Sequence, residues 1–139
     1  MNTSRITGAS LFLVAVVCFL PCAMAEEELE IPAACADAVK FALEAAGPNR
    51  GELIAALKAA KEMSVETPDA LEAMCFLVAQ TPHRGFLKGE LKRDCNTITA
   101  ALLVSNLKGA IAARNKYPWC GALDREAWSR FVLPYRGTT

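Results

Sequence analysis

Apolar residues along this chain recur at spacings of three and four, which is the period of a helix with one buried face. The clearest example lies in the C-terminal third, where one helical stripe carries Leu103, Leu107, Ala110, Ile111 and Arg114. Tyr117-Pro118-Trp119 ends this helix, because a residue that precedes proline is pushed out of the α region. A shorter helix is predicted to begin near Asp124 and to end where Leu133-Pro134 breaks the pattern.

Three further helices precede the long one, and the pattern places them at residues 32–46, 49–64 and 67–80. Gly47-Pro48 ends the first, since glycine permits a left-handed cap and proline cannot continue a helix. Asn49 with Glu52 three residues later indicates a capping box at the start of the second. Thr67 is expected to cap the third, which is apolar nearly all round and therefore belongs in the middle of a bundle.

The long helix is predicted over about residues 90–116, after a turn that ends at Gly85. Phe86 and Leu87 are expected to fill the core beside this turn. Gly109 should mark a close crossing of another helix, because a glycine inside a helix costs about 1 kcal/mol relative to alanine. No segment alternates apolar and polar residues as a half-buried strand does. The predicted fold is therefore all-α: a compact bundle of four to five helices with one long central helix.

The N-terminus has the pattern of a cleaved signal peptide. Leu11–Leu20 is an unbroken apolar run, and one basic residue, Arg5, precedes it. Ala23-Met24-Ala25 puts small residues at the two positions that signal peptidase reads before Glu26. The apolar run is too short to span a bilayer, so no stable membrane span is expected after cleavage. The chain is therefore predicted to be secreted or periplasmic.

Two alternatives remain for this N-terminal segment. One is a lipoprotein signal that anchors the chain through an acylated Cys22, although Pro21 stands where such a site normally carries a small residue. The other is an uncleaved membrane anchor. With residues 1–25 as the signal peptide, residues 26–31 form an acidic leader that is expected to be mobile, and residues 32–139 form the helical domain.

The charge balance of the chain selects no partner. The sequence has 15 basic and 15 acidic residues, and loss of the signal peptide removes one basic residue, which leaves a net charge of −1. A chain so close to neutrality has no net field that attracts nucleic acid or an anionic membrane. Nucleic acid is therefore not an expected partner.

Four cysteines remain after signal cleavage: Cys35, Cys75, Cys95 and Cys120. An even number in an exported chain indicates two disulfides, with three connectivities to choose from. Cys95 and Cys120 flank most of the long helix, whose length would separate them by ~30 Å. A disulfide requires Cα atoms within about 7 Å. That excludes a Cys95–Cys120 bridge, and with it the two-bridge arrangement that contains Cys35–Cys75.

Of the two remaining arrangements, Cys75–Cys95 with Cys35–Cys120 is favoured over Cys35–Cys95 with Cys75–Cys120. The reason is that helices 67–80 and 90–116 are joined by a short turn and should pack antiparallel. The other interpretation is that the cysteines are buried as small apolar side chains. No two of them lie two to four residues apart, so a zinc site is not indicated. Neither a metal nor a cofactor is predicted.

No catalytic residue is predicted in this chain. A cysteine nucleophile needs a histidine to deprotonate it, and the single histidine, His83, lies in a turn. Cys75 is nearest in sequence, but it lies in an apolar helix, where burial raises the pKa of a thiol. Trp119, Trp128 and Tyr135 are expected to pack the two corners against the long helix; the alternative is an aromatic surface for a ligand.

The C-terminal third also carries a specific set of residues at its two aromatic-proline corners: Leu102, Leu103, Asn106, Ala110, Ala113, Arg114, Pro118, Trp119, Val132, Leu133, Pro134, Tyr135 and Arg136. In this set the chain resembles the helical segment that precedes the catalytic core in secreted bacterial transglutaminase-like proteins. The likeness extends over about residues 42–136. Asn106 and Arg114 are expected to anchor the corner backbones through hydrogen bonds. The four cysteines are not part of the family's pattern.

The resemblance implies a noncatalytic helical domain of a secreted transglutaminase-like protein, truncated before the catalytic core, with a scaffold or accessory role. Its partner would be a transglutaminase-like catalytic domain or another extracytoplasmic protein. One alternative is a stand-alone, disulfide-stapled binding module, and another is a fragment of a longer transglutaminase-like cysteine enzyme. An exposed Trp119–Trp128 patch, or a cavity lined by helices 67–80 and 90–116, would favour the binding module. Burial of both tryptophans without a cavity would favour the scaffold.

Overall fold

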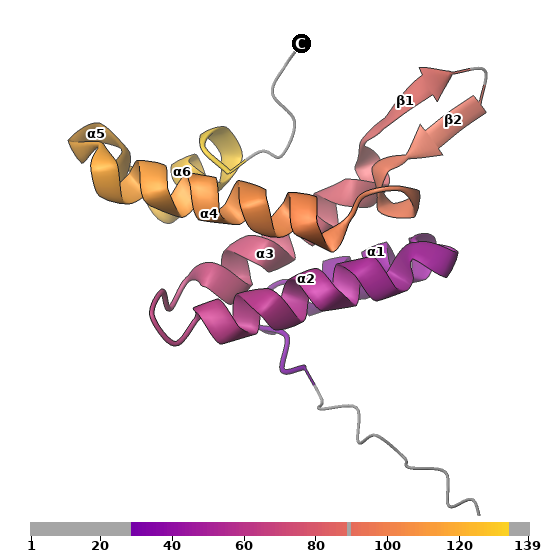
Figure 1. The fold of residues 1–139 in the computed structure, drawn as a ribbon, viewed down its shortest axis with the longest axis horizontal. Helices are drawn as coiled ribbons and strands as arrows, with labels where there is room; N and C mark the ends of the chain where they lie inside the picture. Colours follow the sequence, from indigo (N-terminus) through magenta and orange to yellow (C-terminus); the bar gives the residue numbers. More distant parts are fainter. Residues whose placement is uncertain (1–28, 89, 134–139) are drawn as a thin grey trace, which may run out of the picture.

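The structure, a computed structural model, describes residues 29–88 and 90–133. Six α-helices make up most of this part: α1 (Ala36–Ala45), α2 (Arg50–Met63), α3 (Ala70–Gln80), α4 (Ala100–Lys116), α5 (Pro118–Gly121) and α6 (Arg125–Phe131). They are connected by the short 3-10 helices η1 (Gly47–Asn49), η2 (Thr81–His83) and η3 (Asp94–Asn96) and by a hairpin of β1 (Gly85–Lys88) and β2 (Glu90–Arg93). Figure 1 shows α4 crossing over α2 and α3. The predicted helical fold class is confirmed.

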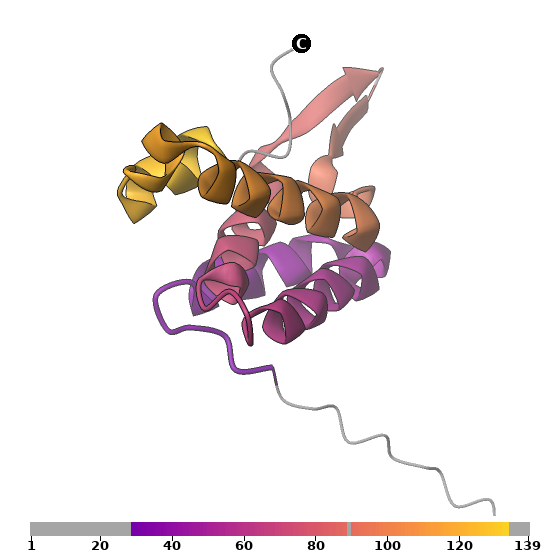
Figure 2. The ribbon, with the colours of Figure 1, turned by 60° about the vertical axis from the view of Figure 1, so that its left-hand side comes forward.

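Helix α3 lies in the middle of the helical body and packs against α1, α2 and α4 (Figures 1 and 2). Its buried residues lie on more than one side of the helix: Ala70, Ala73, Met74, Cys75, Leu77 and Val78. The neighbouring helices contribute the largest part of the remaining core: Val39, Ala42, Leu53, Leu57, Leu103 and Leu107. The central position predicted for this helix from its apolar circumference is therefore confirmed.

The start of α2 is tied to the segment that precedes α4. Asn49 does lie at the N-cap of α2, but its side chain makes no capping bond. Its Nδ2 atom instead donates to the carbonyl oxygens of Cys95 and Ile98, at 2.9 Å each. Glu52 accepts a hydrogen bond from the backbone amide of Ala100 at 2.7 Å. The predicted capping box is therefore wrong, because packing brings another segment's backbone groups within reach of both side chains.

The start predicted for the long helix is also wrong, because Gly85–Lys88 and Glu90–Arg93 pair as antiparallel strands. The backbone groups of the two strands pair with each other, as Phe86 does with Lys92, and α4 begins only after η3. A Cβ atom on Gly85 would lie 2.5 Å from the carbonyl oxygen of Lys92, so this close approach requires glycine. The hairpin projects away from the helices (Figures 1 and 2). Phe86 is 39% exposed and does not fill the core as predicted.

Helix α4 keeps the inward stripe that its sequence predicts. Leu103, Leu107 and Ala110 are buried, and the Thr99 side chain caps the helix by accepting from a first-turn amide. The prediction for Gly109 is wrong: among the described residues, no atom outside the helix's own backbone lies within 4 Å of the position that a Cβ would take there. This glycine faces open space, so no helix crossing offsets its conformational cost.

The chain turns back after α4 through α5 and α6. Pro118 begins α5, and Asp124 caps α6 by accepting a hydrogen bond from the backbone amide of Ala127 at 2.7 Å. Asn106 in α4 donates from its Nδ2 atom to the carbonyl oxygen of Leu133 at 3.0 Å. The predicted anchoring of a corner backbone by Asn106 is therefore observed, and it holds the chain after α6 against α4.

The described chain already contacts the core before α1 begins. Leu29 and Ile31 are partly buried against it, although they belong to the acidic leader predicted over residues 26–31. Pro32 lies in a turn rather than in the first helix, because its carbonyl oxygen accepts a hydrogen bond from the amide of Cys35 at 3.0 Å. The predicted signal peptide, residues 1–25, lies outside the described residues.

Candidate functional site

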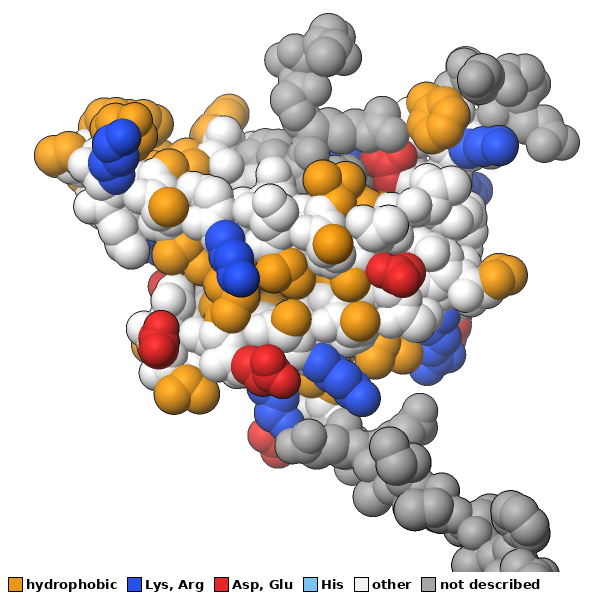
Figure 3. All heavy atoms as spheres, viewed as in Figure 1, with side chains coloured by type: hydrophobic (Ala, Val, Ile, Leu, Met, Phe, Trp, Pro, Cys, Tyr) orange, Lys and Arg blue, Asp and Glu red, His pale blue; other side chains and the backbone are white. Residues whose placement is uncertain are grey.

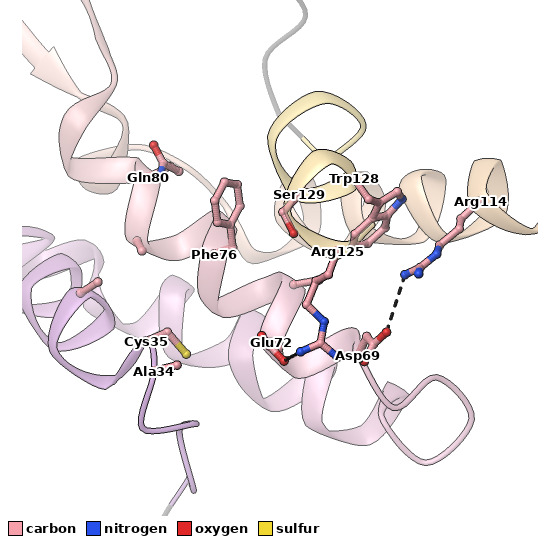
Figure 4. A pocket seen from close by; sticks show the side chains of 13 residues that line it. Ala34, Cys35, Asp69, Glu72, Phe76, Gln80, Arg114, Arg125, Trp128 and Ser129 are labelled. Carbon is pink, nitrogen blue, oxygen red and sulfur yellow. Dashed lines mark hydrogen bonds and ion pairs between the residues drawn. The ribbon is translucent and has the colours of Figure 1, made fainter. Parts of the chain in front are cut away.

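A pocket of about 340 Å³ lies where the start of α1, the length of α3 and the inner face of α6 meet (Figure 4). Small and aromatic residues form part of its wall: Ala34, Ala38, Ala73, Phe76, Ala79 and Trp128. Polar side chains complete the lining: Cys35, Asp69, Glu72, Gln80, Arg114, Arg125 and Ser129. The alanines matter because their short side chains leave space between helices that larger residues would fill.

One end of the pocket is closed by ion pairs between three helices. Arg125 of α6 donates to Asp69 at 2.7 Å and also pairs with Glu72, both at the start of α3. Arg114 of α4 lies 3.6 Å from the second carboxylate oxygen of Asp69. Figure 4 shows the Arg125 guanidinium between the two acidic residues. Asp69 occupies the N-cap of α3, but neither it nor Thr67, the predicted cap, makes a side-chain capping bond.

Trp128 forms the wall between this pocket and a smaller one of about 180 Å³ lined by Thr67, Ile111 and Asn115 among others. The indole is 2% exposed, and the guanidinium of Arg114 lies 5.1 Å from the ring centroid, within the range of a cation–π contact. Its Nε1 hydrogen has no acceptor among the described residues. A buried N–H without a partner costs free energy, and this one lies on the side of the indole that faces Arg114 (Figure 4).

The predicted aromatic corner is divided between core and surface. Trp128 packs against α4, as expected, whereas Trp119 is 63% exposed and stacks on Tyr117 with ring centroids 6.2 Å apart. The expectation that Trp119 packs against the long helix is therefore wrong, because the helix α5 turns it outward. Tyr135 lies outside the described residues.

The residues of the transglutaminase-like pattern do not converge on a single site. Asn106 binds the carbonyl of Leu133, whereas Arg114 contacts Trp128 and Asp69 rather than a backbone carbonyl. Pro118 and Trp119 lie on the exposed outer side of α5. The last three residues of the pattern lie outside the described part: Pro134, Tyr135 and Arg136. Within the described residues, the pattern therefore shapes a corner rather than lining a pocket, apart from Arg114.

The four cysteines carry free thiols in the structure, so neither Cys75–Cys95 nor Cys35–Cys120 is formed and both stay predictions. Cys75 in α3 is fully buried, and burial, with a smaller contribution from Cys35, raises the pKa of its thiol far above the ordinary range. Burial also raises the pKa of the Cys95 thiol. A thiol with a raised pKa is a poor nucleophile at neutral pH, because the thiolate is the reactive form.

His83 lies in η2 at the protein surface, where its ring stacks on Phe41 with centroids 5.9 Å apart. No group of three or more histidine, cysteine or acidic side chains within residues 29–88 and 90–133 is arranged to hold a metal ion. In the same part of the chain, none of the helices combines the length and the apolar character needed to cross a bilayer.

Sequence reasoning missed most of the pocket. It assigned no role to Glu72, Arg125 or Gln80, and it treated Phe76 only as part of the apolar circumference of α3. The available signal was the run of alanines on α1 and α3, which leaves helix surfaces without bulky side chains. That signal does not say which helices meet at the gap, so the pocket follows only from their packing.

A second, more open depression lies between α2 and α4. It is lined mainly by apolar side chains, including Met63, Val65 and Val104, with Lys108 at its edge. Figure 3 shows hydrophobic side chains gathered along this face, with acidic and basic side chains around them. It contains no converging polar groups comparable to those around Trp128, so the α1–α3–α6 pocket is the better candidate site.

Comparisons of the chain with models of protein families, with curated proteins and with solved structures found no match.

Proposed function

We propose that this chain is a noncatalytic, extracytoplasmic helical binding module whose α1–α3–α6 pocket takes a small, uncharged, amphipathic molecule. The pocket carries the proposal: its volume of about 340 Å³ lies in the range of roughly 300–1,000 Å³ that is usual for ligand sites. Its walls are mostly apolar, and a few polar groups are placed among them. The cavity expected of a binding module was one lined by helices 67–80 and 90–116; the observed pocket is instead lined by α3 with α1 and α6, and α4 contributes Arg114.

The charge of the pocket favours a neutral ligand. The two basic residues at its end, Arg114 and Arg125, are balanced by Asp69 and Glu72, and these four side chains pair with one another. A charged ligand would therefore have to compete with an existing ion pair for its partner.

The polar groups favour a ligand with a hydrogen-bond acceptor beside an apolar body. The Gln80 amide and the Ser129 hydroxyl line the pocket, and each can donate a hydrogen bond to such an acceptor. Phe76 and the alanines supply the apolar contact. Burial of a few apolar ligand groups at about 25 cal/mol per Å² would provide most of the affinity, and the polar groups would orient the ligand.

The noncatalytic part of the proposal draws on the positions of the candidate nucleophile and base. The pKa of the Cys75 thiol is raised by burial, by the Cys35 thiol and by the nearby charge of Glu72, which disfavours the thiolate. His83 stacks on Phe41 at the surface. Neither arrangement favours proton transfer from a thiol to an imidazole.

Titration with N-phenylnaphthylamine, an uncharged amphipathic dye, tests the proposal. The dye should bind once per chain and gain fluorescence, and Ala38→Phe should weaken binding roughly tenfold or more, about 1.4 kcal/mol, because the added ring fills the pocket. Ala55→Phe is the matched control, since Ala55 is an exposed alanine of α2 outside the pocket. Equal loss of binding in both variants, or no loss in either, would exclude this pocket as the site.

A second candidate function is an accessory domain beside a transglutaminase-like catalytic domain. The bond between Asn106 and Leu133 supports it, because it gives a structural role to two residues of the family pattern. The genomic DNA that follows the codon for Thr139 provides the test. An in-frame cysteine, histidine and aspartate with the family's spacing would support this role, and their absence from the adjoining reading frames would argue against it.

A further inference from the structure

A smaller pocket, of about 180 Å³, lies where the start of α3 meets the last turns of α4, with Trp128 of α6 beside them. In this α3–α4 pocket, the side chains that can form hydrogen bonds are Thr67, Asp69, Arg114, Asn115 and Trp128. Pro68, Ala70 and Ile111 supply its apolar lining. Its volume is below the roughly 300 Å³ at which sites for drug-sized ligands begin, so it suits a ligand with few nonhydrogen atoms.

One polar atom beside the α3–α4 pocket lacks a partner. Among the described residues, Nε1 of Trp128 is the only buried side-chain nitrogen or oxygen without a hydrogen bond. Figure 4 shows it on the side of the indole that faces Arg114, away from Phe76 and Gln80 of the α1–α3–α6 pocket. Most buried polar groups in proteins are hydrogen-bonded, because an unpaired one costs free energy. An acceptor for this N–H would therefore come from the side of the α3–α4 pocket.

The Arg114 guanidinium beside this nitrogen is held only loosely. Its Nη1 atom lies 3.6 Å from one carboxylate oxygen of Asp69, which is longer than a hydrogen bond. The other oxygen of Asp69 is already paired with Arg125, at 2.7 Å. The Arg114 side chain is 30% exposed, so it can swing outwards without leaving Asp69 unpaired. One oxygen atom between the indole and the guanidinium would then accept hydrogen bonds from both.

The rest of the lining favours an uncharged ligand that both accepts and donates hydrogen bonds. The two charged side chains of the α3–α4 pocket, Arg114 and Asp69, have opposite signs, so they select neither an anion nor a cation. The Thr67 hydroxyl and the Asn115 side-chain oxygen can accept from an N–H group. Ile111 offers an apolar contact to a short aliphatic chain. A carbonyl oxygen, an N–H group and a short aliphatic chain together make a small aliphatic amide.

We propose that the α3–α4 pocket is a binding site for a small aliphatic amide. The carbonyl oxygen of the amide accepts from the Trp128 Nε1–H and from the Arg114 guanidinium, which moves outwards to admit it. The amide N–H group donates to Thr67 or Asn115, and the aliphatic chain lies against Ile111. This site does not depend on the ligand proposed for the α1–α3–α6 pocket, because the indole N–H faces away from that pocket.

Nuclear magnetic resonance of the purified full chain, in the form that cells export, tests the proposal through the tryptophan indole signals. The chain has two tryptophans, so Trp119→Phe identifies the signal of Trp128. Titration with isobutyramide should shift the Trp128 N–H proton downfield to a saturating value, because this proton gains an acceptor. Isobutyrate, which has the same shape but a negative charge, should bind at least about tenfold more weakly.

Two results of this titration would overturn the proposal. The first is a Trp128 signal that does not move with isobutyramide; a cross-peak between this proton and water would then identify a water molecule alone as the partner. The second is tighter binding of isobutyrate than of isobutyramide, which would make the site one for anions.

Ala38→Phe separates the two pockets, because Ala38 lines the α1–α3–α6 pocket and not the α3–α4 pocket. This variant should bind isobutyramide as tightly as the unchanged chain does. Loss of the Trp128 shift in Ala38→Phe would place the probe in the α1–α3–α6 pocket and contradict the proposal.

A pair of methionine variants tests the role of the guanidinium. Arg114→Met should weaken isobutyramide binding roughly tenfold, because methionine has a long side chain but no N–H group to donate. Arg130→Met is the matched control, since Arg130 is an exposed residue of α6 that lines neither pocket. Unchanged binding in Arg114→Met, or an equal loss in both variants, contradicts the assignment. The titration of the unchanged chain decides the matter even where a variant does not fold.

Discussion

Asn106 and Leu133 are joined by a hydrogen bond from the Asn106 Nδ2 atom to the Leu133 carbonyl oxygen, 3.0 Å away and 27 positions along the chain. Leu133 is fully buried, so its carbonyl oxygen has little access to water and depends on this donor. The bond fixes where the chain after α6 returns to α4. It therefore also sets the position of Trp128, which walls the pocket from α6.

Asn106→Ala is expected to lower the free energy of unfolding by about 1–2 kcal/mol, because it leaves a buried carbonyl without a partner. Urea denaturation followed by circular dichroism measures this change. Asn115→Ala is the control, since Asn115 is an exposed residue of the same helix. Equal effects of the two substitutions would mean that the hydrogen bond contributes nothing beyond helix propensity.

Gly109→Ala is expected to stabilise the chain by about 1 kcal/mol, because alanine favours the helix and its Cβ meets no atom of the described residues outside the helix's own backbone within 4 Å. The contrasting substitution is Gly85→Ala, which should destabilise the hairpin because the added Cβ would lie 2.5 Å from the Lys92 carbonyl oxygen. Thermal unfolding of both variants provides the measurement. A loss of stability in Gly109→Ala would show that another part of the protein covers this face of α4.

Asp69→Asn is expected to cost about 0.5–1 kcal/mol of stability, because it removes the carboxylate that pairs with both Arg125 and Arg114. The cost is modest since these side chains are partly exposed, and it should diminish as salt is added. Glu126→Gln is the control: it breaks the exposed pair with Arg130 within α6 and should cost only a few tenths of a kcal/mol. A salt-independent effect would point to hydrogen bonding rather than charge.

The reduced chain is expected to lose stability as the pH rises above about 9, the ordinary pKa of a thiol. Burial raises the pKa of both Cys75 and Cys95 in the folded state, so the folded chain binds these protons more tightly than the unfolded chain does. Below the pKa of the thiols in the unfolded chain, both states keep these protons, so the free energy of unfolding does not vary with pH on their account. Above it, the unfolded thiols lose their protons first and unfolding becomes more favourable.

The neighbours of the two thiols shift the thiol pKa values in both directions. Cys35 and Glu72 add to the raised pKa of Cys75, whereas Arg93 opposes and Asp94 reinforces the rise at Cys95. Urea unfolding of the reduced protein between pH 8 and about 10.5 measures the slope, which is on the order of 1 kcal/mol per pH unit for each buried thiol. Cys75→Ala should reduce that slope. An unchanged slope would show that other groups cause the pH dependence.

Much of the helical architecture follows from local sequence. The stripe of Leu103, Leu107 and Ala110 is buried as its spacing predicts. Gly47 takes the left-handed conformation expected of a helix-ending glycine, with φ of 52°. Asp124 caps α6 at the predicted position. Each of these features depends on residues within one or two turns of each other, so the sequence contains the necessary information.

Several of the failed predictions involve partners distant in sequence. Asn49 and Glu52 have the spacing of a capping box, but backbone groups near Ile98 and Ala100 compete for their side chains. The hairpin was missed because its short strands lack an alternating pattern, and their pairing depends on the close approach at Gly85.

The amino-acid sequence was therefore sufficient for the helical class, for the inner face of most helices and for several of their ends, because each is a property of near neighbours along the chain. The pocket beside Trp128 and the ion pairs of Asp69 emerged only from the folded chain. Hydrophobic periodicity indicates which side of a helix is buried, but it does not specify which other helix covers that side. Contacts between helices depend on that choice, and so does the site that they enclose.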